Sequence, residues 1–158
     1  MFHTKSKSAF TMIEMVFVIV ILGILAAVAI PRLSATRTDA VISKARADIS
    51  SIRSAIMTER QTRLIKGMSS FIPTGTGTYV GTDGNTYNQM DRNGLFGGVL
   101  TYPITDSATD GHWTQTARDV NTTTYQFRVG TSVNTFKYAV SNGTFTCTSG
   151  SECTHLTH

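Results

Sequence analysis

The chain has 158 residues, of which 41% are hydrophobic and only 15% are charged, with a formal net charge of +4. This length suits one modest domain and a membrane helix, and the many Thr, Ser and Gly residues indicate a hydroxyl-rich surface, not an ionic one. A uniformly basic protein is excluded, because residues 32–66 hold eight Lys or Arg against three acids and residues 67–158 hold four against six.

The strongest signal in the sequence is the apolar stretch from Phe10 to Pro31, in which Glu14 is the only charged residue. At about 1.5 Å per residue it reaches roughly 31 Å, about the thickness of the hydrocarbon core of a bilayer. Lys5 and Lys7 precede it without an acid, which predicts that the chain after the span lies outside the cytoplasm. A cleaved signal peptide, with an A-x-A pattern at residues 27–29, and an uncut signal anchor are two readings of this stretch.

A third reading follows from the run Ala9-Phe10-Thr11-Met12-Ile13-Glu14 with the apolar segment and Pro31. It resembles the N-terminus of the type IV pilin and pseudopilin superfamily, in which a prepilin peptidase cuts before a Phe-Thr-x-x-Glu sequence and methylates the new amino terminus. The resemblance implies a leader at residues 1–9, cut between Ala9 and Phe10, and a transmembrane and filament-core helix at residues 10–31. Ala9 departs from the Gly usual in the family, so we expect cleavage at a reduced rate.

The resemblance also implies roles for single residues in assembly. Glu14 is costly inside a membrane, and one reading is that it reaches back to the lipid headgroups. The resemblance implies instead that Glu14 pairs with the α-amino group of Phe10 in a neighbouring subunit and sets the axial register. Gly23 and Pro31 mark a part of the helix that, by the same resemblance, unwinds during assembly. The implied partners are further copies of the chain, the prepilin peptidase and an inner-membrane assembly platform.

Residues 32–66 continue as an amphipathic helix, with an apolar stripe that repeats every seven residues through Ile42, Ile49 and Ile56. A stripe of this kind predicts packing on a sheet better than a free coiled coil, and the helix should end near Lys66-Gly67. The basic residues on its other faces leave nucleic-acid binding open. A solvated face is the simpler reading, because no aromatic residues are interleaved with these cations.

Residues 67–158 are predicted to form the exported pilin-like domain. Residues 68–121 indicate a partly irregular connection with one or two short strands. Alternation over 124–129 and 136–140, and the Asn142-Gly143 hairpin signal, predict a three-stranded antiparallel β-meander at 122–149. Its apolar face should be covered by the stripe on the helix. The predicted fold class is therefore α+β, with a long N-terminal helix packed on a C-terminal meander.

Two kinds of small site are predicted near the C-terminus. Cys147 and Cys153 fit one local disulfide in an oxidising compartment, although with His155 and His158 they could also be counted as four zinc ligands. We expect no cofactor, apart from a calcium ion that the family resemblance allows. The acids considered for it are Asp106, Asp110 and Asp119, because some pseudopilins bind calcium in a loop of this domain.

The sequence contains no catalytic set: the four histidines are scattered and no G-x-S-x-G motif is present. We therefore expect a structural filament subunit in the bacterial inner membrane, single-pass, with its C-terminal domain in the periplasm. The favoured role is that of a type II secretion pseudopilin. The alternatives are a surface type IV pilin serving adhesion, motility or DNA uptake, and an exported domain with a signal peptide or a simple anchor.

Overall fold

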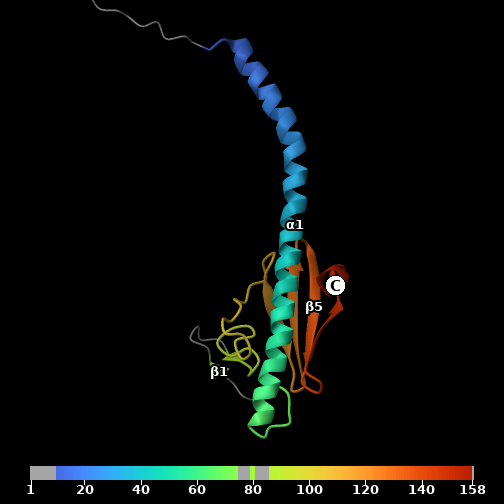
Figure 1. The fold of residues 1–158 in the computed structure, drawn as a ribbon. Helices are drawn as coiled ribbons and strands as arrows, with labels where there is room; N and C mark the ends of the chain where they lie inside the picture. The colour runs from blue at the N-terminus through green and yellow to red at the C-terminus, as the bar shows by residue number, and fades with distance from the viewer. Residues whose placement is uncertain (1–9, 75–78, 81–85, 158) are drawn as a thin grey trace, which may run out of the picture. The chain divides into compact units, whose positions relative to one another are not determined.

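The computed structural model describes residues 10–74, 79–80 and 86–157, so the predicted leader at 1–9 lies outside the described residues (Figure 1). The structure divides into two compact units, Met1–Arg37 and Thr38–His158. The boundary falls inside the first helix, α1, which runs from Met12 to Ile65.

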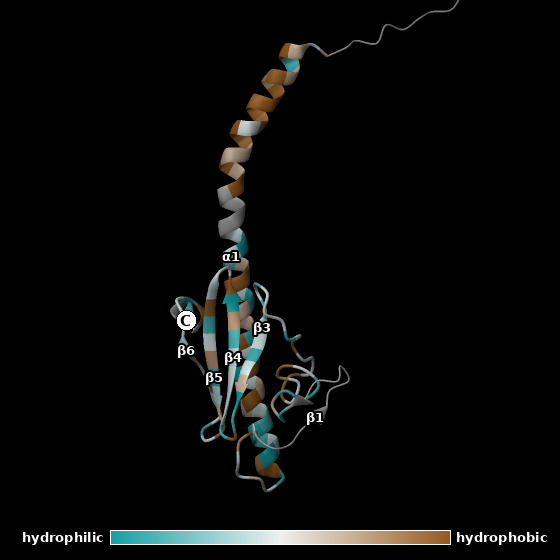
Figure 2. Ribbon diagram, turned by 180° about the vertical axis from the view of Figure 1, so that it is seen from behind, coloured by the Kyte–Doolittle hydropathy of each residue, from teal (hydrophilic) through white to brown (hydrophobic). Residues whose placement is uncertain are grey.

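In the first unit, α1 is apolar on all sides. Its segment Met12–Ile30 has a mean hydropathy of 3.0 and is mostly brown in Figure 2. None of this segment is buried within the structure. Burying apolar surface is favourable in water, so a helix exposing it in every direction needs a cover from outside the chain. By length and composition, this segment can cross a membrane.

In the second unit, the rest of α1 buries one face. Ala45, Ile49, Ile52 and Ile56 are buried at spacings of four, three and four residues, which places them on one side of a helix. The helix ends in a Schellman motif, in which the Gly67 N–H donates to Leu64 O and the Met68 N–H to Arg63 O. Gly67 has φ +79°, a value that glycine adopts without strain. The predicted end near Lys66-Gly67 matches this motif.

The sheet that covers this face has four antiparallel strands in the order β3-β4-β5-β6. Their bounds are Trp113–Arg118, Thr122–Val129, Ser132–Ala139 and Thr144–Ser149. Along β4 every second side chain is buried, as the period of a half-buried strand requires. The predicted meander at 122–149 is formed by β4, β5 and β6. One further strand, β3, pairs with β4 at the edge of the sheet and places Trp113 in the core. The fold is α+β, with a pilin-like arrangement of helix and sheet.

The core lies between α1 and the sheet and is mostly aromatic. Phe96, Trp113, Tyr125, Phe136 and Phe145 are all buried, with neighbouring ring centroids 4.5 to 5.9 Å apart. A short helix, α2 (Cys153–Thr157), adds the buried Leu156. Ile42 and Val140, both predicted for this core, are only half-buried at its margin.

The connection before β3 is mostly irregular, as predicted. It holds two short paired strands, β1 (Tyr79–Val80) and β2 (Thr86–Tyr87), followed by turns. These turns are part of the core, because Met90, Leu95 and Phe96 are fully buried. The connection therefore fills the space beside the sheet and contributes to the packed interior.

Candidate processing and assembly site

The start of α1 is a capping box formed by Thr11 and Glu14. The Thr11 N–H and hydroxyl both donate to Oε2 of Glu14, at 2.7 and 2.8 Å, and the Glu14 N–H points back to the Thr11 hydroxyl at 3.3 Å. This reciprocal arrangement satisfies donors that a helix start otherwise leaves unpaired. It gives Glu14 a structural role that the sequence reading did not assign to it. Oε1 of Glu14 has no hydrogen-bond partner within the described part of the chain.

Phe10 lies two residues before the helix, and 78% of its surface is exposed. Ala9, on the other side of the predicted cleavage point, is outside the described residues. Phe10, the first residue after the predicted cleavage point, is therefore accessible and outside the helix. Cleavage before Phe10 and methylation of its amino group stay predictions.

Gly23 and Pro31 both lie within α1, which is continuous from Met12 to Ile65. A Cβ added at Gly23 meets no atom within 4 Å. Gly23 therefore makes no close contact within the chain that would require a glycine. The proposed unwinding between these two residues concerns an assembled filament, so it stays a prediction.

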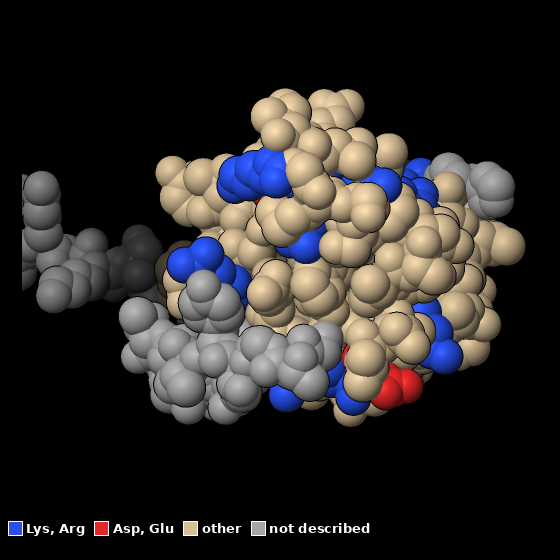
Figure 3. Space-filling view, turned by 90° about the horizontal axis from the view of Figure 1, so that it is seen from below, with Lys and Arg blue, Asp and Glu red and all other residues tan. Residues whose placement is uncertain are grey.

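Five cations of the second half of α1 donate hydrogen bonds to main-chain carbonyls within the folded domain. Lys44 donates to Gly111 O at 2.7 Å, Arg53 to Phe145 O at 3.1 Å and Arg63 to Ser70 O at 3.2 Å. Arg46 and Arg60 likewise donate to main-chain carbonyls, of His155 and Ser69. Seen from below, the domain carries its basic side chains as separate patches (Figure 3). Most basic residues of this half-helix thus make hydrogen bonds within the chain. This differs from the nucleic-acid-binding face considered from the sequence.

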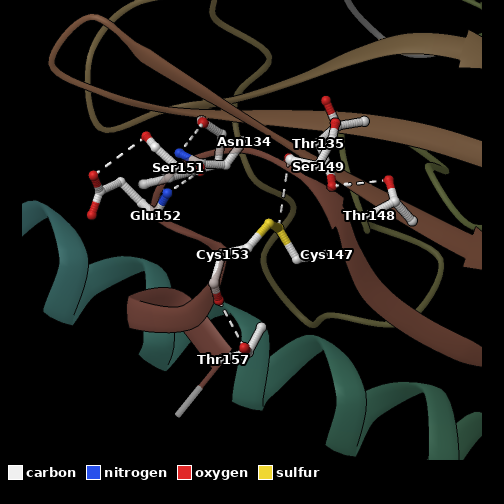
Figure 4. Close-up of a disulfide and its surroundings, with 10 residues drawn as sticks. Asn134, Thr135, Cys147, Thr148, Ser149, Ser151, Glu152, Cys153 and Thr157 are labelled. Carbon is white, nitrogen blue, oxygen red and sulfur yellow. Dashed lines mark hydrogen bonds between the residues drawn. A yellow bond between two sulfur atoms is a disulfide. The ribbon is translucent and has the colours of Figure 1, made fainter.

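Cys147 of β6 and Cys153 at the start of α2 form a disulfide, with their Cα atoms 5.7 Å apart (Figure 4). The bond fixes α2 to the last strand of the sheet. Two sulfurs bonded to each other are not thiolate ligands, so the alternative zinc reading of these cysteines does not fit the structure. His158 of that reading lies outside the described residues.

Two of the three aspartates considered for calcium, Asp110 and Asp119, accept hydrogen bonds from main-chain N–H groups. Asp110 Oδ1 accepts from the Gly130 N–H at 2.7 Å, and Asp119 Oδ1 accepts from the Val120 N–H at 2.7 Å. Among the described residues, no group of three or more His, Cys, Asp or Glu side chains is placed to hold a metal ion. The calcium site at Asp106, Asp110 or Asp119 stays a prediction without a geometric cluster to support it.

A buried polar network around Asp91 was missed from the sequence. The Asp91 carboxyl accepts from the Tyr125 hydroxyl at 2.7 Å, the Phe96 N–H at 2.9 Å and Gln115 Nε2 at 3.0 Å. Burial raises the pKa of Asp91 to about 6, although these donors favour its charged form. Gln115 belongs to β3 and Tyr125 to β4, so the buried Asp91 attaches the 88–96 turn to both strands.

Comparison with known proteins bears on the N-terminal segment alone. Residues 4–30 match a family model described as the prokaryotic N-terminal methylation motif. No curated protein and no solved structure matches the chain. The matched range includes Ala9, Phe10, Glu14 and Gly23 and ends one residue before Pro31. The chain thus carries, at its N-terminus, the prepilin-type cleavage and methylation segment of the type IV pilin and pseudopilin superfamily.

Proposed function

We propose that this protein is a structural filament subunit. Its precursor is held in the bacterial inner membrane by Met12–Ile30, with the domain of the second unit in the periplasm. A prepilin peptidase removes residues 1–9 and methylates Phe10, and an assembly platform then packs the subunits through their N-terminal helices. The observation that carries this proposal is the methylation motif on a helix whose apolar side chains the chain itself leaves uncovered.

Within this role we favour a type II secretion pseudopilin, because the domain is small and carries little beyond a four-stranded sheet and its connection. The disulfide favours the second candidate, a surface type IV pilin. Deleting the gene separates these two functions. Loss of secreted exoproteins with normal surface pili supports the first, and loss of pili, adhesion, motility or DNA uptake with normal secretion supports the second.

Mass spectrometry of the mature N-terminus tests the proposal itself. An N-methylated Phe10 is the expected result. A chain that begins at Ile30 is the product of a signal peptidase, and an intact Met1 marks an uncut anchor. Either of these two results contradicts assembly as a processed filament subunit.

Glu14→Gln tests the assembly role of the carboxylate. The glutamine side chain keeps an oxygen to accept from Thr11, so the helix cap is largely retained, but it has no charge to attract an α-amino group. We expect normal membrane insertion and processing with a loss of sheared filaments, measured by immunoblot. Thr11→Val is the matched control for the cap, because it removes the Thr11 hydroxyl that donates to Oε2 and leaves the carboxylate. Wild-type filament levels in Glu14→Gln would show that no charge pairing is needed.

A further inference from the structure

A cleft of about 310 Å³ opens on the surface of α1 beside α2, within the second unit. Its floor is apolar, made by the buried side chains of Ile49 and Leu156. Two arginines and three hydroxyl groups surround the floor, and no acidic side chain is among the described residues that line it: Arg46, Ser50, Arg53, Ser54 and Thr157. The described side chains of the lining therefore carry two positive charges and no negative one.

Both arginines are held in place by the folded chain. Arg46 Nε donates to His155 O at 2.5 Å, and Arg53 Nε donates to Phe145 O at 3.1 Å. Each guanidinium has five N–H donors, so fixing Nε orients the group and leaves its terminal nitrogens for another acceptor. No carboxylate in the described part of the chain hydrogen-bonds either guanidinium.

The hydroxyls add donors between and beside the two cations. Arg46, Ser50 and Arg53 are four and three residues apart, so they share one face of α1, and Ser54 is one turn beyond Ser50. The Thr157 hydroxyl donates to Cys153 O at 2.7 Å, so its hydrogen is already used. The remaining donors among the lining residues are thus those of Arg46, Arg53, Ser50 and Ser54.

We propose that this cleft binds a phosphate group, either free phosphate or a phosphate monoester. A phosphate monoester carries about −1.5 to −2 charges at pH 7 and three acceptor oxygens, which matches two guanidiniums and the serine hydroxyls between them. A carboxylate brings one charge and two oxygens, and leaves one arginine without a partner. Arginine suits phosphate because its planar donors bind oxyanions in a bidentate manner. The site does not depend on the filament role.

The test is isothermal titration calorimetry of the full-length protein in detergent micelles at pH 7.5 and constant ionic strength. Inorganic phosphate should bind saturably, sulfate should compete because it has the same shape and charge, and chloride should not. The double variant Arg46→Gln/Arg53→Gln should weaken binding at least about ten-fold, as expected for loss of charge-assisted hydrogen bonds. The matched control is Arg118→Gln/Lys137→Gln, which removes two exposed cations of the sheet and should bind like wild type.

A second variant and a second probe sharpen the result. Ser50→Asp places a negative charge in the cleft while keeping both arginines, and should also abolish binding. In amide NMR spectra, phosphate should shift the signals of residues 46–54 and 156–157, and the same spectra report whether each variant is folded. Glycerol 3-phosphate that binds more tightly than inorganic phosphate identifies a monoester whose organic part covers Ile49 and Leu156, and equal affinity identifies free phosphate. Binding that survives in Arg46→Gln/Arg53→Gln, falls equally in the control, or shifts signals elsewhere overturns the proposal.

Discussion

Asp91 is an ionisable group that the folded protein holds out of water. Its native pKa, raised by burial to about 6, lies above its ordinary value of 3.8. The folded state therefore binds a proton more tightly than the unfolded state between these two pH values. Its contribution to stability is fully present below about pH 4, decreases as the pH rises through 6, and is constant above that.

The predicted consequence is a free energy of unfolding that falls by about 2 kcal/mol from pH 4 to pH 7 through Asp91 alone. Asp91→Asn cannot ionise, so the difference in stability between wild type and this variant should change by that amount across the range. Urea unfolding at each pH measures it. Asp39→Asn, which removes an exposed carboxyl of α1, is the control. A pH-independent difference for Asp91→Asn would mean that burial does not raise this pKa.

Gly143 and Gly130 form a matched pair for a second prediction. Both have positive φ, +69° and +58°. A Cβ at Gly143 would lie 2.2 Å from the Phe71 ring, whereas one at Gly130 would meet no atom within 4 Å. Gly130→Ala should cost about 1–2 kcal/mol for its backbone conformation, and Gly143→Ala at least about 1 kcal/mol more for the displaced ring.

Urea midpoints of the two variants measure this difference. The Phe71 ring also lies under the Arg60 guanidinium, 4.3 Å from the ring centroid, so displacing the ring should disturb that contact too. Equal costs for Gly130→Ala and Gly143→Ala would show that the Phe71 ring moves without penalty.

Single residues also show where sequence reading fails. The apolar alternation that marks β4 and β5 was sufficient to predict their buried faces. The buried role of Asp91 could not be predicted, because its partners Gln115 and Tyr125 are 24 and 34 residues away. Asp48 likewise has a distant partner, since its Oδ2 accepts from Trp113 Nε1 at 3.0 Å, 65 residues away. Long-range polar partners of this kind leave no local pattern in a sequence.

At the scale of elements, helix α1 and the meander were predictable because their hydrophobic patterns repeat regularly over many residues. Strand β3 was not, since WTQTAR has one large apolar residue and its last three residues are exposed. It is a strand because β4 provides a hydrogen-bonding edge and because Trp113 fills the aromatic core. Tertiary context outweighs local propensity here.

Helix α2 has five residues and depends on its attachments, chiefly the Cys147–Cys153 disulfide and the Arg46 contact with His155 O. Replacing both cysteines by serine should lower the free energy of unfolding by about 2 kcal/mol, as expected for so short a loop. Hydrogen exchange should accelerate most at the amides of Cys153–Thr157, beyond the change in the core strands β4 and β5. Equal acceleration everywhere would show that α2 is not anchored separately by this bond.

At the scale of the whole molecule, the two units differ in whether they bury their own apolar side chains. Every core residue lies between Ala45 and Leu156, so the second unit contains all of its own buried interior. In the first unit, residues 10–30 are all exposed and mostly apolar, and this surface is the part of the molecule that requires a membrane or other subunits.

A fragment comprising residues 38–158 should therefore be soluble and folded without detergent. Circular dichroism and a cooperative thermal transition measure this, with full-length protein in micelles as the reference. We expect the two melting temperatures to agree within a few degrees, because every core residue of the described chain lies outside residues 1–37. A fragment that lacks a cooperative transition would mean that the N-terminal half of α1 supports the domain.

The cap formed by Thr11 and Glu14 has a consequence for the timing of maturation. All three of its donors, the Thr11 N–H, the Thr11 hydroxyl and the Glu14 N–H, belong to the part of the chain that remains after a cut before Phe10. Removing the leader and methylating the new terminus would therefore leave the first turn of the helix already stabilised. A subunit waiting in the bilayer would need no refolding at its tip before joining its neighbours, and the second carboxylate oxygen would be available for them.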